Sequence, residues 1–170
     1  MESVWSREVE IPEREALKKD LDVFAAVIGG GMAGILTAYA LKCQGKNVVV
    51  LEADRIAGGQ TKNTTAKITG QHGMIYDKLI KHYGKEKAAV YARANKVAID
   101  AFEWLAQEKK IECEFKRVPA YLYSTEDEKK LRKEAIAANY LGISAFFTKE
   151  TDLTFPVKGA VCYENQAQFH

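Results

Sequence analysis

The stretch that decides the fold is Val27-Ile28-Gly29-Gly30-Gly31-Met32-Ala33-Gly34, in which the glycines follow the spacing G-x-G-x-x-G. In this pattern Gly29 permits a tight turn, Gly31 lets the backbone approach a pyrophosphate, and Gly34 lets a helix pack closely on a strand. The unpaired N–H groups and the positive dipole end of the helix that follows favour an anion there. The stretch therefore predicts a turn from a strand into a helix, built to hold phosphate.

The residues on either side of this turn complete a strand–helix–strand unit. Residues 22–28 are a short apolar run rich in β-formers, which predicts a strand buried on both faces. Residues 32–43 have apolar side chains at helical spacing, and Gly45 follows where a helix C-terminus is expected. Residues 47–51 are a second apolar strand. Such a βαβ unit is expected to be parallel and right-handed.

An acidic residue, Glu52, follows the second strand directly, 21 residues after Gly31. A carboxylate at this position accepts hydrogen bonds from ribose hydroxyls and repels a 2′-phosphate, so NADP is disfavoured, although Arg55 lies close by in the sequence. From these residues alone both NAD and FAD remain as ligands. The phosphate-binding residues predicted by the turn are Gly29, Gly31, Met32, Ala33 and Gly34.

A long irregular segment then separates the unit from the next helix. Residues 53–69 are rich in Gly, Thr, Asn and Lys and show neither a two-residue nor a helical period. A nicotinamide-type Rossmann unit usually continues into another crossover helix at this point. A loop of roughly 15 residues is long enough to indicate a function, and it disfavours a stand-alone NAD-binding oxidoreductase.

Residues 27–52, followed by the loop sequence Gly-Gly-Gln-Thr-Lys-Asn-Thr-Thr-Ala-Lys-Ile-Thr-Gly-Gln-His at 58–72, resemble a known family. They are similar to the FAD-dependent oxidoreductases of the D-amino-acid oxidase and glycine oxidase superfamily, and within it to the bacterial branch with a C-terminal Rieske domain. The resemblance covers nearly the whole chain but only the N-terminal portion of a family member. Gly-Gly-Gln stands where relatives commonly have Gly-Gly-Arg.

The resemblance implies FAD as the cofactor, with the loop running along it from the adenosine ribose toward the flavin ring. Glu52 and Ala53 would lie at the adenosine. The loop residues implied to bind the cofactor are Gly59, Thr61, Thr64, Thr65, Ala66 and Lys67, the last five of them at the flavin or ribityl chain.

The resemblance also implies an activity, the oxidation of a small amine or amino-acid-like substrate by hydride transfer to flavin. The electron acceptor stays open between oxygen, a quinone and an iron–sulfur partner. The chain has no C-x-H…C-x-x-H set, so a 2Fe-2S centre would lie outside it, and no other metal site is expected. No catalytic residue is assigned, because in this superfamily the substrate pocket comes from later sequence.

The remaining sequence predicts helices and a small antiparallel lobe. Helices are expected over residues 74–83 and 85–110, which Gly84 separates, and over 126–141 with Thr125 as the N-cap. Strands are expected over residues 112–118, 120–124, 145–148 and 160–163. The fold class is therefore α/β, with a Rossmann-like βαβ FAD-binding domain on a parallel sheet, further helices and the start of an antiparallel substrate lobe.

These elements suggest three parts. Residues 1–21 are a charged leader, residues 22–110 are a partial FAD-binding domain, and residues 111–170 are the start of a substrate lobe with a return segment. The leader lacks the apolar core of a signal peptide, and no stretch has the composition of a membrane span. Three widely spaced cysteines without C-x-x-C indicate neither a disulfide framework nor a zinc site, and we expect a cytoplasmic protein.

Length and charge limit the possible classes of function further. The chain has 170 residues and a formal net charge of +2, from 25 basic and 23 acidic residues, which gives no electrostatic argument for nucleic acid. For a flavoenzyme of this superfamily 170 residues is short, so we expect the chain alone to be inactive. The alternative to a working FAD-binding part is a truncated, non-catalytic fragment that binds flavin weakly or not at all. Its open sheet edges would favour a homo-oligomer.

Overall fold

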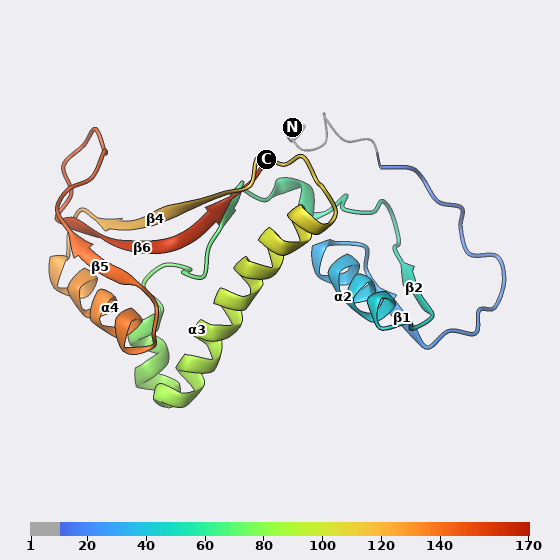
Figure 1. The fold of residues 1–170 in the computed structure, drawn as a ribbon, viewed down its shortest axis with the longest axis horizontal. Helices are drawn as coiled ribbons and strands as arrows, with labels where there is room; N and C mark the ends of the chain where they lie inside the picture. The colour runs from blue at the N-terminus through green and yellow to red at the C-terminus, as the bar shows by residue number, and fades with distance from the viewer. Residues whose placement is uncertain (1–10) are drawn as a thin grey trace. The chain divides into compact units, whose positions relative to one another are not determined.

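A computed structural model describes residues 11–170, and the chain divides into two compact units, one ending at Thr65 and the other running from Ala66 to His170. The first unit contains strand β1 (Ala25–Ile28), helix α2 (Met32–Cys43) and strand β2 (Val48–Leu51). β1 and β2 are parallel, with Ala25 opposite Val48 and Ile28 opposite Leu51 (Figure 1). The predicted βαβ unit is confirmed, although each strand is shorter at its start than expected.

The segment after β2 is more ordered than its sequence suggests. It contains a short 3₁₀ helix, η1 (Gln60–Asn63), and the two-residue strand β3 (Lys67–Ile68), which belongs to the second unit. The prediction of an irregular loop over residues 53–69 is therefore wrong in part, because two stretches within it find hydrogen-bond partners that lie far away in the sequence.

The second unit is a small antiparallel sheet with helices. Its further elements are α3 (Tyr76–Glu108), β4 (Lys116–Ser124), α4 (Glu128–Tyr140), β5 (Ala145–Thr148) and β6 (Gly159–Gln168). Strand β6 is the centre of the sheet and pairs antiparallel with β3, β4 and β5 (Figure 1). The predicted antiparallel lobe is confirmed. The whole of α3 belongs to the second unit. The domain boundary expected between residues 110 and 111 stays a prediction.

Three of the expected element limits are wrong. β4 is one strand that begins at Lys116 and continues through Pro119, where the pairing register shifts between Val118 and Ala120. A bulge is where a strand tolerates proline, because proline has no N–H for the ladder. β6 continues to Gln168, well beyond the predicted end at Tyr163. The N-cap of α4 is Asp127 rather than Thr125, since Asp127 Oδ1 accepts the backbone N–H of Lys130 at 3.0 Å.

Helix α3 bends at Gly84, whose φ of 78° and ψ of 165° are not helical. A residue without a Cβ adopts this conformation at low cost. The two helices expected on either side of Gly84 are therefore present as two sections of one element, and the section after the bend covers residues 85–108.

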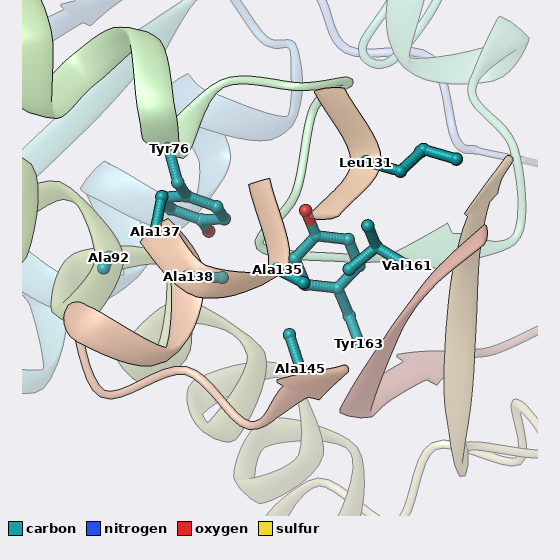
Figure 2. Close-up of a cluster of buried hydrophobic side chains, with 9 residues drawn as sticks. All are labelled: Tyr76, Ala92, Leu131, Ala135, Ala137, Ala138, Ala145, Val161 and Tyr163. Carbon is teal, nitrogen blue, oxygen red and sulfur yellow. The ribbon is translucent and has the colours of Figure 1, made fainter. Parts of the chain in front are cut away.

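The core of the second unit lies between α4, the start of α3 and the sheet. Its buried side chains are drawn in Figure 2: Tyr76, Ala92, Leu131, Ala135, Ala137, Ala138, Ala145, Val161 and Tyr163. The buried carboxylate of Glu134 on α4 accepts the backbone N–H groups of Ile75, Tyr76 and Asp77, at 2.8 to 3.0 Å. The first turn of α3 has no intrahelical partners for these N–H groups, so Glu134 caps it.

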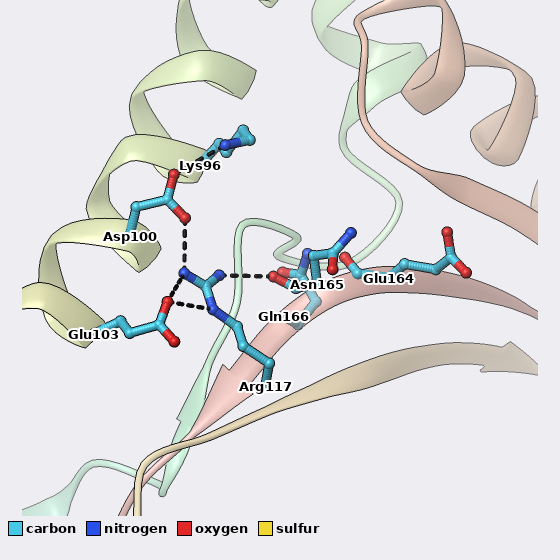
Figure 3. Close-up of polar contacts among 7 residues, drawn as sticks. All are labelled: Lys96, Asp100, Glu103, Arg117, Glu164, Asn165 and Gln166. Carbon is cyan, nitrogen blue, oxygen red and sulfur yellow. Dashed lines mark hydrogen bonds and ion pairs between the residues drawn. The ribbon is translucent and has the colours of Figure 1, made fainter.

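A second polar cluster joins α3 to the sheet (Figure 3). The guanidinium of Arg117 on β4 bonds Asp100 Oδ1 at 2.7 Å and Glu103 Oε2 at 2.6 Å, and donates to the carbonyl of Asn165 on β6 at 3.0 Å. Hydrogen bonds from Lys96 and then from Arg117 lower the pKa of Asp100. The cluster fixes the C-terminal section of α3 against β4 and β6.

Candidate functional site

The candidate site is the glycine turn between β1 and α2. Gly29 has a φ of +99°, a conformation that favours glycine, and its N–H donates to the carbonyl of Leu51 at 2.7 Å. A Cβ on Gly34 would overlap the carbonyl oxygen of Gly29, so only glycine lets α2 start this close to β1. The local geometry expected of Gly29 and Gly34 is therefore present, while their contact with a cofactor stays a prediction.

The two central glycines of the turn differ from each other. A Cβ on Gly30 would collide with the side chain of Ile56, in the segment after β2. A Cβ on Gly31 would make only an ordinary contact, 3.4 Å from Thr61 Oγ1. The side of the turn at Gly31 thus has room for an approaching group, whereas the side at Gly30 is filled by the protein itself.

Glu52 is bound to the turn. Its Oε2 accepts the N–H of Gly30 at 2.6 Å, and its Oε1 accepts the N–H of Asp54 at 3.1 Å. These backbone hydrogen bonds, that from Gly30 first, lower the pKa of the Glu52 carboxyl, so it is ionised at neutral pH. These bonds hold the carboxylate at the end of β2 in one orientation. In dinucleotide-binding folds a carboxylate at this position accepts hydrogen bonds from ribose hydroxyls.

Thr61 reaches the same helix start from η1. Its Oγ1 accepts the N–H of Met32 at 3.0 Å, and its carbonyl accepts the hydroxyl of Thr64 at 3.1 Å. The sequence pointed to Thr61 only through the family resemblance, as a flavin contact, and did not predict that it caps α2. The first turn of α2 (Met32, Ala33, Gly34) contains no acidic side chain that would compete with an anion for the positive helix end.

The other predicted cofactor residues fall on both units. Ala53 follows Glu52 in the first unit, and the carbonyl of Gly59 accepts from the Asn63 side chain at 3.4 Å. Thr65 is the last residue of that unit. Ala66 and Lys67 belong to the second unit, where the Ala66 carbonyl accepts the N–H of Phe169 and Lys67 pairs with Gln168 in the sheet. The structure brings together Gly29 to Gly34, Glu52 and Thr61.

An open cavity of about 1260 Å³ adjoins the carboxyl end of β2. Glu52, Ala53, Ile56 and Thr61 line it, together with residues 11–19 of the N-terminal segment. Arg55, also on its lining, pairs with Glu13 at 3.4 Å. No sequence pattern indicates that residues 11–19 adjoin the site. Ile56 could have been noticed as a large apolar side chain in the polar stretch before η1.

Three further observations concern the described residues. Within residues 11–170, no three His, Cys, Asp or Glu side chains gather in a way that could hold a metal ion. Cys43, Cys113 and Cys162 are all free thiols. The helices of this part of the chain are each too short or too polar to cross a membrane.

Comparison with known proteins connects this geometry to a family. The family model described as FAD dependent oxidoreductase matches residues 25–170. YhfW of Bacillus subtilis (strain 168), named as a candidate Rieske 2Fe-2S iron-sulfur protein, is 39% identical over 99% of this chain. The chain spans about a third of that protein, 34% of its length. The mitochondrial protoporphyrinogen oxidase of Nicotiana tabacum is 44% identical over 52 residues, which are 31% of this chain and 9% of that protein.

Solved structures share the fold at low identity. The L-proline dehydrogenase from P. horikoshii has a TM-score of 0.66 at 20% identity and matches 85% of this chain and 37% of its own. The glycine oxidase from Bacillus cereus ATCC 14579 has a TM-score of 0.61 at 17% identity, over 87% of this chain and 40% of its own. The fold of this chain thus recurs in these structures.

Proposed function

Since this chain belongs to the FAD dependent oxidoreductase family, we propose that it is the FAD-binding part of a flavoenzyme that oxidises a small amine or amino-acid-like substrate. The observation that carries the proposal is the glycine turn with Glu52 bonded to Gly30 at 2.6 Å. It combines a ribose-binding carboxylate with a helix N-terminus suited to a pyrophosphate in one rigid unit.

The residues present fit the cofactor. Gly31 has space beside it, Gly34 brings α2 close to β1, and the start of α2 has no acidic side chain. In the proposed site the N–H groups of Gly31, Ala33 and Gly34 hold the pyrophosphate, and Gly29 shapes the turn. Met32 adjoins the pyrophosphate while its own N–H is donated to Thr61. Glu52 accepts from the ribose, with Ala53 beside the adenosine.

The loop supplies the rest of the proposed site. Its backbone and hydroxyl groups would orient the ribityl chain and the flavin ring, and the Lys67 ammonium would favour negative charge on the ring. The loop residues assigned this role are Gly59, Thr61, Thr64, Thr65, Ala66 and Lys67. When bound, the flavin supplies hydride acceptance, while the protein binds, orients and excludes water.

The substrate class is supported by the relatives that share the fold. The structures described above are named as an L-proline dehydrogenase and a glycine oxidase, and an L-amino acid deaminase from Proteus vulgaris has a TM-score of 0.60 at 19% identity, over 92% of this chain and 37% of its own. All three names refer to amino acids. The name of YhfW supports an iron–sulfur centre, outside this chain, as the electron acceptor. We place the protein in the reducing cytoplasm, which its free thiols support.

A second candidate is supported by the sheet of the first unit. Within residues 11–170, β1 and β2 form a two-stranded sheet, and Phe24 and Ile28 are 63% and 79% exposed. Two strands are marginal as an independent sheet. The 170-residue chain alone would then bind flavin weakly, would not turn over substrate, and would need another polypeptide segment to cover these side chains.

The visible spectrum of the purified chain after incubation with FAD and removal of free ligand separates the two candidates. Retained flavin absorption, shifted from that of free FAD, supports a working cofactor site. A colourless protein that fails to retain FAD contradicts the first candidate and leaves the second.

A further inference from the structure

The section of α3 after the bend has an apolar stripe on its exposed side. Val90, Val97 and Trp104 follow one another at intervals of seven residues and are 57%, 58% and 55% exposed. Ala94 and Ala101 lie between them and are also exposed. The opposite face contains Ala92 and Ile99, which are buried in the unit's core. One helix thus has two apolar faces, and the core covers only one of them.

The stripe has the spacing of a helix–helix seam. Apolar residues alternating at four and three residues form the seam along which two helices pack side by side. Residues 85–108 span roughly 36 Å, enough for several successive contacts. A surface helix with an ordinary single face would have charged or polar residues at these positions.

We propose that this stripe binds the same stripe of a second copy of the chain, with the two α3 helices antiparallel. In that register the two valines of one copy lie opposite alanines of the other. Val90 faces Ala101 of the second copy, and Val97 faces Ala94. The alternation of large and small side chains lets the helices approach closely without a void.

Charge complementarity favours the antiparallel direction. The same register places the Lys87 ammonium of one copy at the indole ring of Trp104 of the other, a cation–π pair. It also places Arg93 beside Asp100 at the edge of the seam. A parallel pair would set Lys87 against Lys87 and Trp104 against Trp104, which adds like-charge repulsion and crowding.

Asp100 is already fixed for this contact within one copy. Arg117 and Lys96 bond its carboxylate at 2.7 and 2.9 Å (Figure 3), and its side chain is still 46% exposed. Since both oxygens already have a cationic partner, Arg93 of the second copy would join them from the solvent side and add little affinity, so the Lys87–Trp104 contact is what favours the antiparallel direction. The proposed interface contains no flavin-binding residue. Dimer formation can therefore be confirmed or contradicted independently of FAD binding.

The first test is the molar mass of the chain in solution, measured by light scattering during size-exclusion chromatography. We expect a dimer for the wild type and a monomer for Val97→Glu. Ile136→Glu, which alters a residue 70% exposed on α4, is the matched control and should stay dimeric. A monomeric wild type, or a Val97→Glu variant that folds and stays dimeric, overturns the proposal.

The second test does not rely on a destabilising variant. In a Cys43→Ser background, which removes the exposed native thiol, Val90→Cys and Ala101→Cys proteins are mixed and oxidised. The antiparallel register predicts disulfide-linked pairs in this mixture and none in Val90→Cys alone or in Val90→Cys mixed with Ala94→Cys. Linked pairs in Val90→Cys alone indicate a parallel pair, and no links in any sample indicate that the stripes do not meet; both contradict the proposal.

Discussion

The backbone N–H of Gly30 donates to Oε2 of Glu52 at 2.6 Å, which joins the turn after β1 to the residue after β2. The second oxygen of the same carboxylate accepts the N–H of Asp54. Both oxygens thus have backbone donors, and each retains lone pairs for a ligand hydroxyl. This explains why a carboxylate is used at position 52, since an amide has only one acceptor atom.

The first prediction concerns Glu52→Gln. The amide can satisfy Gly30 or Asp54 but not both, and it also loses the charge that the ribose hydroxyls donate to. We expect FAD affinity to fall at least about tenfold, measured by fluorescence titration. Glu128→Gln, at a half-buried glutamate on α4 outside the candidate site, serves as the control and should leave the affinity unchanged. Equal affinities for Glu52→Gln and wild type would show that Glu52 does not contact the cofactor.

The pH dependence of stability follows from the same carboxylate. Its pKa in the folded chain lies below the ordinary value of 4.5, because of the backbone N–H donors. A group with a lowered folded pKa stabilises the fold above its unfolded pKa and loses this contribution as the pH falls through the folded value. We therefore expect wild type to exceed Glu52→Gln in urea-denaturation midpoint at pH 7. The difference should shrink below about pH 4.5. A difference that grows on acidification would contradict the assignment.

The turn predicts opposite phenotypes for two glycines. In Gly34→Ala the new methyl overlaps the Gly29 carbonyl, so we expect a loss of about 1–3 kcal/mol in the free energy of unfolding. In Gly31→Ala the methyl meets Thr61 at an ordinary distance, so stability should hold while FAD binding weakens. Chemical denaturation and FAD titration of both variants check this. If Gly31→Ala were the less stable variant, the assignment of the two glycines would be reversed.

The buried carboxylate of Glu134 predicts a large effect on the second unit. Glu134→Ala leaves the N–H groups of Ile75, Tyr76 and Asp77 without their acceptor in the interior, and we expect a loss of about 3 kcal/mol or more. Glu128→Ala removes two partly exposed ion pairs from the same helix, with Arg132 and Lys149, and should cost no more than about 1 kcal/mol in the free energy of unfolding. Similar midpoints for Glu134→Ala and wild type would show that water replaces the lost acceptor.

The βαβ part of the first unit was predictable from the sequence because its signals are local. The apolar runs around residues 25–28 and 48–51, and the glycines between them, each dictate conformation within a few residues. Gly84 likewise marked the bend in α3. The antiparallel character of the lobe followed from short strands separated by turn residues.

The rest depends on contacts between distant residues. Thr61 caps α2 from 29 residues away, and no local pattern signals this. Glu164, Asn165 and Gln166 are polar and do not look like a strand, yet β6 continues through them because it is paired with β4. Thr125 and Asp127 are both good caps in sequence, and the geometry of the chain leaving β4 selects Asp127. The exposed stripe of α3 has the same helical spacing as the buried face, so the sequence pattern does not distinguish the two faces.

The most direct test of the central claim is equilibrium titration of FAD into the flavin-free chain, compared between wild type and Gly31→Val. Gly31 has an ordinary extended backbone, with a φ of −76°, so valine should not unfold the turn. We predict saturable quenching of flavin fluorescence for wild type and none for Gly31→Val, while NAD fails to compete. Equal binding by the two proteins, or no binding by wild type, would contradict the claim that this turn holds FAD.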